Sequence, residues 1–186
     1  MEIVFTEAHS SGDLMGILDL QTLNHVSNIG GDTAKEQGFV TVRHDFTTLS
    51  AMNKEFRHVV AKQDDRIVGY ALVMLKEFGK NIPELISMFE EIENIQYNNM
   101  PLGKLSYFVM GQVCVASEVR GMNVFASLYG KLKQNMAPHF DYIVTEIAER
   151  NTRSMRAHSK IGFTTIHSYT EDLGERWNVV LLPTHG

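Results

Sequence analysis

Two stretches of the sequence have residue types and spacing that could do chemistry, and the first could hold a phosphate group. There, Arg120 and Gly121 form a short turn between an apolar run, Tyr107–Val115, and a helical pattern that begins near Val124. The first turn of a helix has backbone N–H groups without intrahelical acceptors and a positive dipole end, and both suit a pyrophosphate. Arg120 adds a fixed positive charge beside it. Taken alone, an Arg-Gly pair is also compatible with an ordinary strand-to-helix turn.

The second stretch runs from Val144 to Phe163 and contains a carboxylate, an amide and an imidazole. A buried strand pattern is followed by Glu146, and Asn151 begins a helical pattern that includes His158. Asn151 fits the N-cap of that helix, and an asparagine that binds a ligand would look identical in sequence. The second stretch is therefore informative mainly in combination with the first.

Together, the two stretches make the sequence resemble the GNAT superfamily of acyl-CoA-dependent N-acyltransferases. The family pattern is Asn, a small residue three positions on, an aromatic residue or His seven positions on, and a closing Gly-Phe. The matching residues are Asn151, Ser154, His158, Gly162 and Phe163. The family's Arg/Gln-x-x-Gly-x-Gly/Ala loop aligns with Arg120, Asn123 and Phe125. The order of elements matches from Met1 to Leu182, which is nearly the whole chain.

The loop departs from the family pattern at two positions, where Asn123 and Phe125 replace small residues. Asn tolerates positive φ better than most residues, so a tight turn remains feasible. Phe125 is bulkier, and its ring must point into the core so that only its N–H faces the phosphates.

The fold that the resemblance implies is consistent with the elements read from the sequence. Strands that pair early, followed by alternating strands and helices, indicate a mixed α/β protein. The resemblance implies a mixed, mostly antiparallel central sheet of six to seven strands with helices on both faces. It also implies that two central strands, Tyr107–Val115 and Tyr142–Ile147, splay apart and expose main-chain donors that a closed sheet would use.

Apolar periodicity and turn residues predict the other elements. We predict further strands over Met1–Thr6, His58–Gln63, Ile67–Leu75, Thr164–Tyr169 and Trp177–Leu182. We predict helices from Gly12 to about Leu23, from a cap at Thr47/Thr48, over Pro83–Ile95, from Val124 to a stop at Pro138, and over Asn151–Lys160.

The activity that the resemblance implies is transfer of an acetyl group from acetyl-CoA to a primary amine of a small molecule or peptide. Glu146 would take the proton of the amine, and His158 would donate a proton to the leaving thiolate. The backbone N–H of Val115 would polarise the thioester carbonyl, and the backbone of Val113 would meet the pantetheine arm. Other residues expected to bind acetyl-CoA are Arg120, Gly121, Met122, Asn123, Val124, Phe125, Asn151 and Ser154. The structural alternatives are a surface glutamate and a histidine that only packs or binds CoA.

Two further hypotheses concern the acceptor and the class of function. We expect the segment Phe78–Lys104 to form one wall of the acceptor site, because loops at strand ends carry specificity in such folds. Its apolar stripe either packs on its own sheet or forms a homodimer contact; the stripe is Leu85, Met88, Phe89 and Ile92. The acidic helix Pro83–Ile95 and Asp45 would favour a cationic acceptor, unless they form a solvated face. The altered loop keeps a second class open, namely a non-catalytic acyl-CoA-binding sensor or interaction module.

Composition narrows the classes of protein. The chain has 186 residues, 44% of them apolar, and this length fits one domain over residues 1–186. A net charge of −5 argues against broad nucleic-acid binding. No apolar run is long enough for a membrane span, and the opening residues do not resemble a secretory signal. We therefore expect a soluble, cytoplasmic protein.

Cysteine and histidine usage bears on disulfides, metals and nucleophiles. The single cysteine, Cys114, excludes an internal disulfide and alternates with Val113 and Val115, so we expect a small buried hydrophobic side chain there. The eight histidines show no H-x-x-x-H or H-E-x-x-H spacing, so we expect no metal site.

Overall fold

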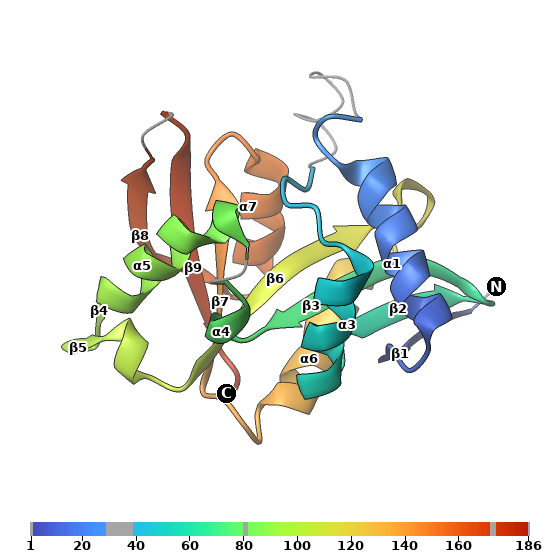
Figure 1. The fold of residues 1–186 in the computed structure, drawn as a ribbon, viewed down its shortest axis with the longest axis horizontal. Helices are drawn as coiled ribbons and strands as arrows, with labels where there is room; N and C mark the ends of the chain where they lie inside the picture. Colours follow the sequence, from blue (N-terminus) through green and yellow to red (C-terminus); the bar gives the residue numbers. More distant parts are fainter. Residues whose placement is uncertain (1, 29–38, 80–81, 172–173, 186) are drawn as a thin grey trace.

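A seven-stranded sheet is the centre of the computed structural model, which describes residues 2–28, 39–79, 82–171 and 174–185 (Figure 1). The strand order is β1-β2-β3-β6-β7-β9-β8, and every neighbouring pair is antiparallel except β6 and β7. The strands are β1 Ile3–Glu7, β2 Val59–Gln63, β3 Arg66–Met74, β6 Tyr107–Val115, β7 Tyr142–Ala148, β8 Thr164–Thr170 and β9 Arg176–Pro183. The predicted mixed, mostly antiparallel sheet is confirmed.

Helices cover both faces of this sheet. α1 and α3 pack on each other over β3, and α6 lies against β1, β2 and β3 from the other face (Figure 1). The helices are α1 Ser11–Asn24, α3 Phe46–Glu55, α4 Lys76–Gly79, α5 Ile86–Asn94, α6 Val124–Met136 and α7 Thr152–Lys160. Short 3-10 turns are η1 Pro83–Leu85, η2 Leu102–Lys104 and η3 Ser117–Val119, and a small hairpin consists of β4 Gln96–Tyr97 and β5 Met100–Pro101.

Side-chain caps fix where the first helices begin. Ser10 and Asp13 form a capping box, in which each side chain accepts a hydrogen bond from the other residue's amide at 3.1 Å. Helix α3 is capped by Asp45, whose Oδ1 accepts from the amide of Thr48 at 2.7 Å. The cap predicted at Thr47/Thr48 was therefore wrong by two to three residues. Asp45 does not belong to the lining of either cavity described below, so the structure does not support its predicted contribution to the acceptor site.

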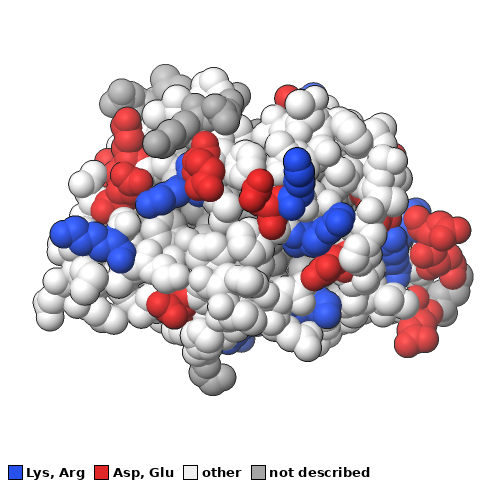
Figure 2. All heavy atoms as spheres, turned by 60° about the horizontal axis from the view of Figure 1, so that its bottom comes forward, with Lys and Arg blue, Asp and Glu red and all other residues white. Residues whose placement is uncertain are grey.

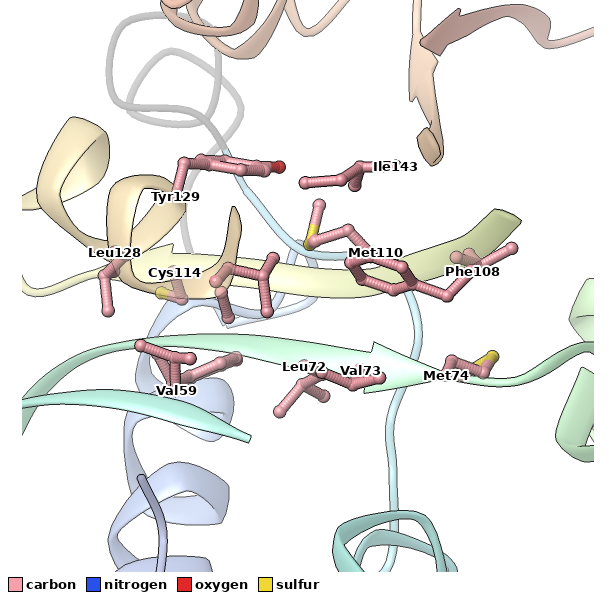
Figure 3. Packing of buried hydrophobic residues seen from close by; sticks show 14 of the residues in the cluster. Val59, Leu72, Val73, Met74, Phe108, Met110, Cys114, Leu128, Tyr129 and Ile143 are labelled. Carbon is pink, nitrogen blue, oxygen red and sulfur yellow. The ribbon is translucent and has the colours of Figure 1, made fainter. Parts of the chain in front are cut away.

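The core lies between the sheet and its helices. From Ile67 to Met74 every residue of β3 is buried, because helices cover both of its faces. Figure 3 shows side chains of β3, β6 and α6 packed in one cluster, among them Leu72, Cys114 and Leu128. Burial raises the pKa of the Cys114 thiol to about 12, so this cysteine stays a neutral, buried side chain as predicted.

The sheet opens between its two central strands. β6 and β7 pair only over Tyr107–Val109 and Tyr142–Val144, and then they diverge. At the point of divergence the hydroxyl of Thr145 donates to the carbonyl of Met110 at 2.9 Å. The other edge of β7 stays paired with β9 along its whole length. The predicted splay is thus confirmed, and it leaves the second half of β6 unpaired on the β7 side.

Charged side chains are mixed on the surface. On the part of the described surface that Figure 2 shows, Lys and Arg side chains lie beside Asp and Glu side chains rather than in a continuous basic area. Within the described ranges, no helix combines the length and apolar character that crossing a membrane requires.

A buried histidine joins α3 to the sheet. His58 is fully buried, and one of its ring nitrogens, Nε2, donates to the carbonyl of Leu49 at 3.2 Å. The other ring nitrogen, Nδ1, accepts from the amide of Val73 at 3.1 Å. Burial lowers the pKa of His58 to about 3, so the ring is neutral in the folded protein.

We predict that His58→Leu lowers the free energy of unfolding by about 2–4 kcal/mol at pH 7.5, because two buried backbone groups lose their partners. The folded pKa lies below the unfolded value, so the wild-type protein loses stability as pH falls below 6.5. The variant lacks this loss, so the difference in unfolding free energy between wild type and variant should be about 2 kcal/mol smaller at pH 5 than at pH 7.5. Urea unfolding at both pH values measures this difference. The same difference at both pH values would contradict the assigned tautomer and pKa.

Candidate active site

Two cavities meet at the opening between β6 and β7. The first, of about 400 Å³, lies between the end of β6, the N-terminus of α6 and helix α7. The second, of about 540 Å³, lies along the diverging halves of β6 and β7 and reaches η1, α5, β8 and β9. The residues that line both are Phe39, Val40, Val113, Asn151 and Ser154. Groups bound in the two cavities would therefore meet at the splay.

The unpaired edge of β6 directs backbone groups into this opening. The amide of Ala116 donates to Val68 on β3 at 2.9 Å. Successive residues of a strand direct their backbone polar groups to opposite edges, so the amides of Val115 and Val113 face the opening. The carbonyl of Val115 accepts from Nε of Arg120 at 3.1 Å. Both residues line the first cavity, and Val113 also lines the second.

The turn before α6 has the backbone shape that an anion site requires. Gly121 has φ +82° and Asn123 has φ +61°, so both adopt the left-handed region. The first helical bond joins the amide of Ser127 to the carbonyl of Asn123, so the amides of Val124, Phe125 and Ala126 precede it. All three of these residues line the first cavity. The substitution of Asn for Gly in the loop is accommodated by this conformation.

Cationic side chains surround the first cavity. Arg120, Arg153 and Lys160 contribute to its lining. Burial, and to a smaller degree the neighbouring charge of Arg153, lower the pKa of Arg120. Arg120 also donates from Nη2 to Oδ1 of Asn24 at 3.0 Å, which ties the end of β6 to the end of α1. Sequence reasoning found the charge of Arg120 but not this second, structural role.

The ring of Phe125 packs into an aromatic cluster rather than into the turn. Its centroid lies 5.1 Å from that of Tyr129 and 5.0 Å from that of His158. Phe163 joins the cluster, 5.0 Å from His158 and 5.2 Å from Tyr129. The bulky residue in the loop is accommodated because its side chain adds to the core, as its size required.

His158 is held inside this cluster. It is 1% exposed, and its Nδ1 donates to the carbonyl of Ser154 at 2.8 Å. Its Nε2 accepts from the hydroxyl of Tyr129 at 2.7 Å. Burial lowers its pKa to about 4, so the ring is neutral and carries no spare proton near pH 7. His158 also lines the second cavity, but both of its ring nitrogens are engaged, so its hydrogen bonding lends no support to the predicted role as proton donor to the thiolate.

Asn151 anchors residues 39–42, a segment that lines both cavities and is called the strap below. Its Oδ1 caps α7 by accepting from the amide of Ser154 at 3.3 Å, and its Nδ2 donates to the carbonyl of Phe39 at 3.2 Å. Gln112 donates from Nε2 to the carbonyl of Val42 at 2.8 Å. Asn151 therefore acts as a helix cap and as an anchor of the strap, a contact that sequence spacing does not reveal.

Glu146 faces the second cavity. Burial, and to a smaller degree the charges of Glu171 and Glu91, raise its pKa to about 7, while a hydrogen bond with Tyr169 opposes the shift. Its Oε1 is buried and has no hydrogen-bond partner among the described residues. A carboxyl group with a pKa near 7 can accept a proton at neutral pH, which is the property that a general base needs.

The insertion between β3 and β6 contributes one wall of the second cavity. The lining residues are Pro83, Leu85, Ser87 and Met88, at η1 and the start of α5. The polar loop Gln96–Lys104 does not belong to the lining, so only the first half of the predicted wall lies at the cavity. The apolar stripe of α5 is buried against the protein's own core. Among the described residues, no cluster of three His, Cys, Asp or Glu could hold a metal ion.

Comparison with known proteins finds matches in structure but none in sequence. No family model matches the chain, and no curated protein is significantly similar to it in sequence. Solved structures align over nearly its full length. An acetyltransferase of the GNAT family from Streptococcus pneumoniae aligns with TM-score 0.64 at 10% identity, over 98% of this chain and 99% of that one.

The chain has the GNAT fold. The ribosomal-protein-S18-alanine N-acetyltransferase from Escherichia coli aligns with TM-score 0.61 at 11% identity, over 98% of this chain and 94% of that one. The putative acetyltransferase yncA from Salmonella typhimurium, determined with its cofactor acetyl-CoA, aligns with TM-score 0.62 at 13% identity over the same shares. The GNAT resemblance in two short motifs therefore extends to the fold of the whole chain.

We predict that Glu146→Gln stabilises the protein at alkaline pH relative to acid pH. The folded pKa of Glu146 lies above the unfolded value of 4.5, so wild-type stability falls as pH rises from 4.5 through about 7. Glutamine does not titrate, so the difference in unfolding free energy between variant and wild type should shift by about 1–3 kcal/mol in favour of the variant between pH 4.5 and 8.

The exposed Glu118 provides the control. Its carboxylate pairs with Arg66 at 2.7 Å and its pKa is lowered, so Glu118→Gln should gain nothing as pH rises. Thermal or urea unfolding at both pH values measures the two differences. The same pH dependence for both variants would contradict the raised pKa of Glu146.

Proposed function

We propose that the protein transfers an acetyl group from acetyl-CoA to a primary amine, without a covalent enzyme intermediate. The observation that carries this proposal is Glu146, a buried carboxyl group with a pKa of about 7, in a cavity that meets a cation-lined cavity at the splay. The GNAT fold supports it, since the structures that share the fold are described as acetyltransferases.

Acetyl-CoA would occupy the first cavity as the acyl-donor substrate. Its pyrophosphate suits the free amides at the start of α6 together with Arg120 and Arg153. Its pantetheine arm suits the exposed edge of β6 at Val113. The thioester carbonyl then lies within reach of the amide of Val115, which would stabilise the negative charge that develops on the oxygen.

The amine acceptor would occupy the second cavity. Glu146 takes a proton from the ammonium group, and the neutral amine nitrogen attacks the carbonyl carbon of the thioester. The tetrahedral intermediate collapses by cleavage of the C–S bond. The proton that leaves the nitrogen neutralises the CoA thiolate, directly or through water, so the products are the acetamide and CoA. His158 supports this site by packing against Phe125 and takes no part in proton transfer.

We predict that Arg120→Glu raises the Kd for acetyl-CoA about 10–100-fold, because a repulsive charge replaces an attractive one beside the phosphates. Arg153→Glu should act in the same direction without removing the hydrogen bonds of Arg120 to Val115 and Asn24. Arg66→Glu, a change of equal charge on an exposed side chain, is the control. Isothermal calorimetry measures all three, and an unchanged Kd in both cavity variants would remove this site assignment.

We predict that the wild-type protein acetylates members of an amine panel and that Glu146→Gln lowers kcat about 10²–10⁴-fold with little change in the Kd for acetyl-CoA. The wild-type kcat/KM should rise with pH up to about 7, where Glu146 loses its proton, and this limb should be absent in the variant. Glu118→Gln is the control.

A sensor or interaction module would give a different result in the same experiment. Acetyl-CoA would bind with no turnover of any amine, and Glu146→Gln would change neither. That outcome would contradict the proposed enzymatic function and support the binding role instead.

A further inference from the structure

Two buried polar atoms at the second cavity lack hydrogen-bond partners among the described residues. They are Oε1 of Glu146 and the indole Nε1 of Trp177. Both residues belong to the lining of that cavity. An unsatisfied buried polar group destabilises the folded protein, and a ligand that pairs with it offsets that cost. An indole N–H can only donate, whereas a carboxylate oxygen accepts.

The register of the sheet places these two side chains on the same face. Trp177 pairs with Ala148 of β7, and Ala148 lies two residues after Glu146. Side chains two positions apart on a strand share a face, so Glu146 and Trp177 are diagonal neighbours across β7 and β9. Such neighbours lie about 7–8 Å apart at their Cα atoms, which a small ligand can bridge.

Charge near the cavity selects the kind of oxygen that Trp177 could meet. Glu171 and Glu91 place negative charge near Glu146. The lining cation Arg150 forms an ion pair with Glu175, which offsets its charge. A carboxylate on the acceptor would be repelled there, whereas a neutral carbonyl oxygen would not. The neighbouring apolar lining suits an aliphatic side chain; it includes Val42, Leu85 and Met88.

We propose that Trp177 donates its indole N–H to a neutral carbonyl oxygen beside the reacting amine, so that the acceptor is an α-amino amide. This chemistry occurs at the amino terminus of a peptide and in a free amino-acid amide. The amine would face Glu146 while the carbonyl oxygen faces Trp177. The proposal rests on the proposed acetyl transfer, and binding alone can test it.

The sequence contains one tryptophan, so the indole N–H gives one resonance in a ¹H–¹⁵N spectrum. With CoA present, which allows no turnover, leucinamide should move this resonance downfield to saturation. The probe 3-methylbutylamine has the same chain without the carboxamide, and free leucine has a carboxylate in its place. Neither should move the resonance comparably. An equal response to all three, or no response to leucinamide, would overturn the proposal.

Kinetics supply the second measurement. Trp177→Phe keeps an aromatic ring and removes the N–H donor; its smaller size should affect both amines alike. The ratio of kcat/KM for leucinamide to that for 3-methylbutylamine should fall about tenfold in this variant, because the lost bond serves only the amide. The intrinsic basicity of each amine cancels in the comparison with wild type. Tyr97→Phe is the matched control, since Tyr97 packs on Tyr142 and lies outside the cavity lining.

The outcomes separate this inference from the proposed function. Equal loss for both amines would give Trp177 a packing role and overturn the inference while acetyl transfer stands. Saturable binding of leucinamide at Trp177 with no acetylation of any amine would overturn the proposed function while recognition stands. A comparison of leucinamide with Leu-Gly-Gly-amide distinguishes a free amino-acid amide from a peptide amino terminus. If the acceptor is a peptide, kcat/KM should be higher for the longer substrate.

Discussion

The divergence of β6 from β7 is the constraint on which the rest of the site depends. A continuous sheet would use every backbone donor of β6, and the amides of Val113 and Val115 would be unavailable. Pairing ends after Val109 and Val144, where the hydroxyl of Thr145 donates to the carbonyl of Met110 in place of a further backbone pair. Beyond that point each strand is held by its outer neighbour, β3 or β9. The opening is therefore set by the register of the strands.

Burial acts on two titratable groups beside this opening in opposite ways. It raises the pKa of Glu146 to about 7 and lowers that of His158 to about 4, because in both cases the charged form is disfavoured. The carboxyl group keeps an unpartnered oxygen at a cavity, so it can exchange a proton. The imidazole also lines this cavity, but both of its ring nitrogens are engaged, by the hydroxyl of Tyr129 and the carbonyl of Ser154. Proximity in the sequence motif does not distinguish these two fates, whereas hydrogen bonding does.

The sequence predicted the elements well where a period or a cap is local. β6 was predicted at its observed bounds, and α6 ends before Pro138, because buried strands and helix stops have local signals. The cap of α3 was misplaced because Asp45, Thr47 and Thr48 are all competent caps and only geometry selects one. The splay came from the resemblance, since no residue pattern in β6 or β7 by itself indicates it.

Contacts between segments that are distant in the sequence could not be predicted from the sequence alone. The strap is fixed by Gln112 and Asn151 through bonds to its carbonyl groups, which any residue type provides. Trp177 reaches the second cavity only because the register of β9 sets it opposite Ala148. Neither relation leaves a trace in spacing along the chain.

Two cavities that meet at a single gap have a consequence for the order of events in the proposed reaction. In that reaction each substrate would have its own cavity, so neither would have to leave before the other arrives, and the acetyl group would be transferred within a ternary complex. A relay through the protein would need a nucleophile at the crossing point. Cys114 lies next to it, but with a thiol pKa of about 12 it remains protonated and carries no acyl group. The architecture thus favours direct transfer between the two substrates over a covalent acyl-enzyme intermediate. In such a reaction the acetyl group stays at the gap only as long as the ternary complex lasts.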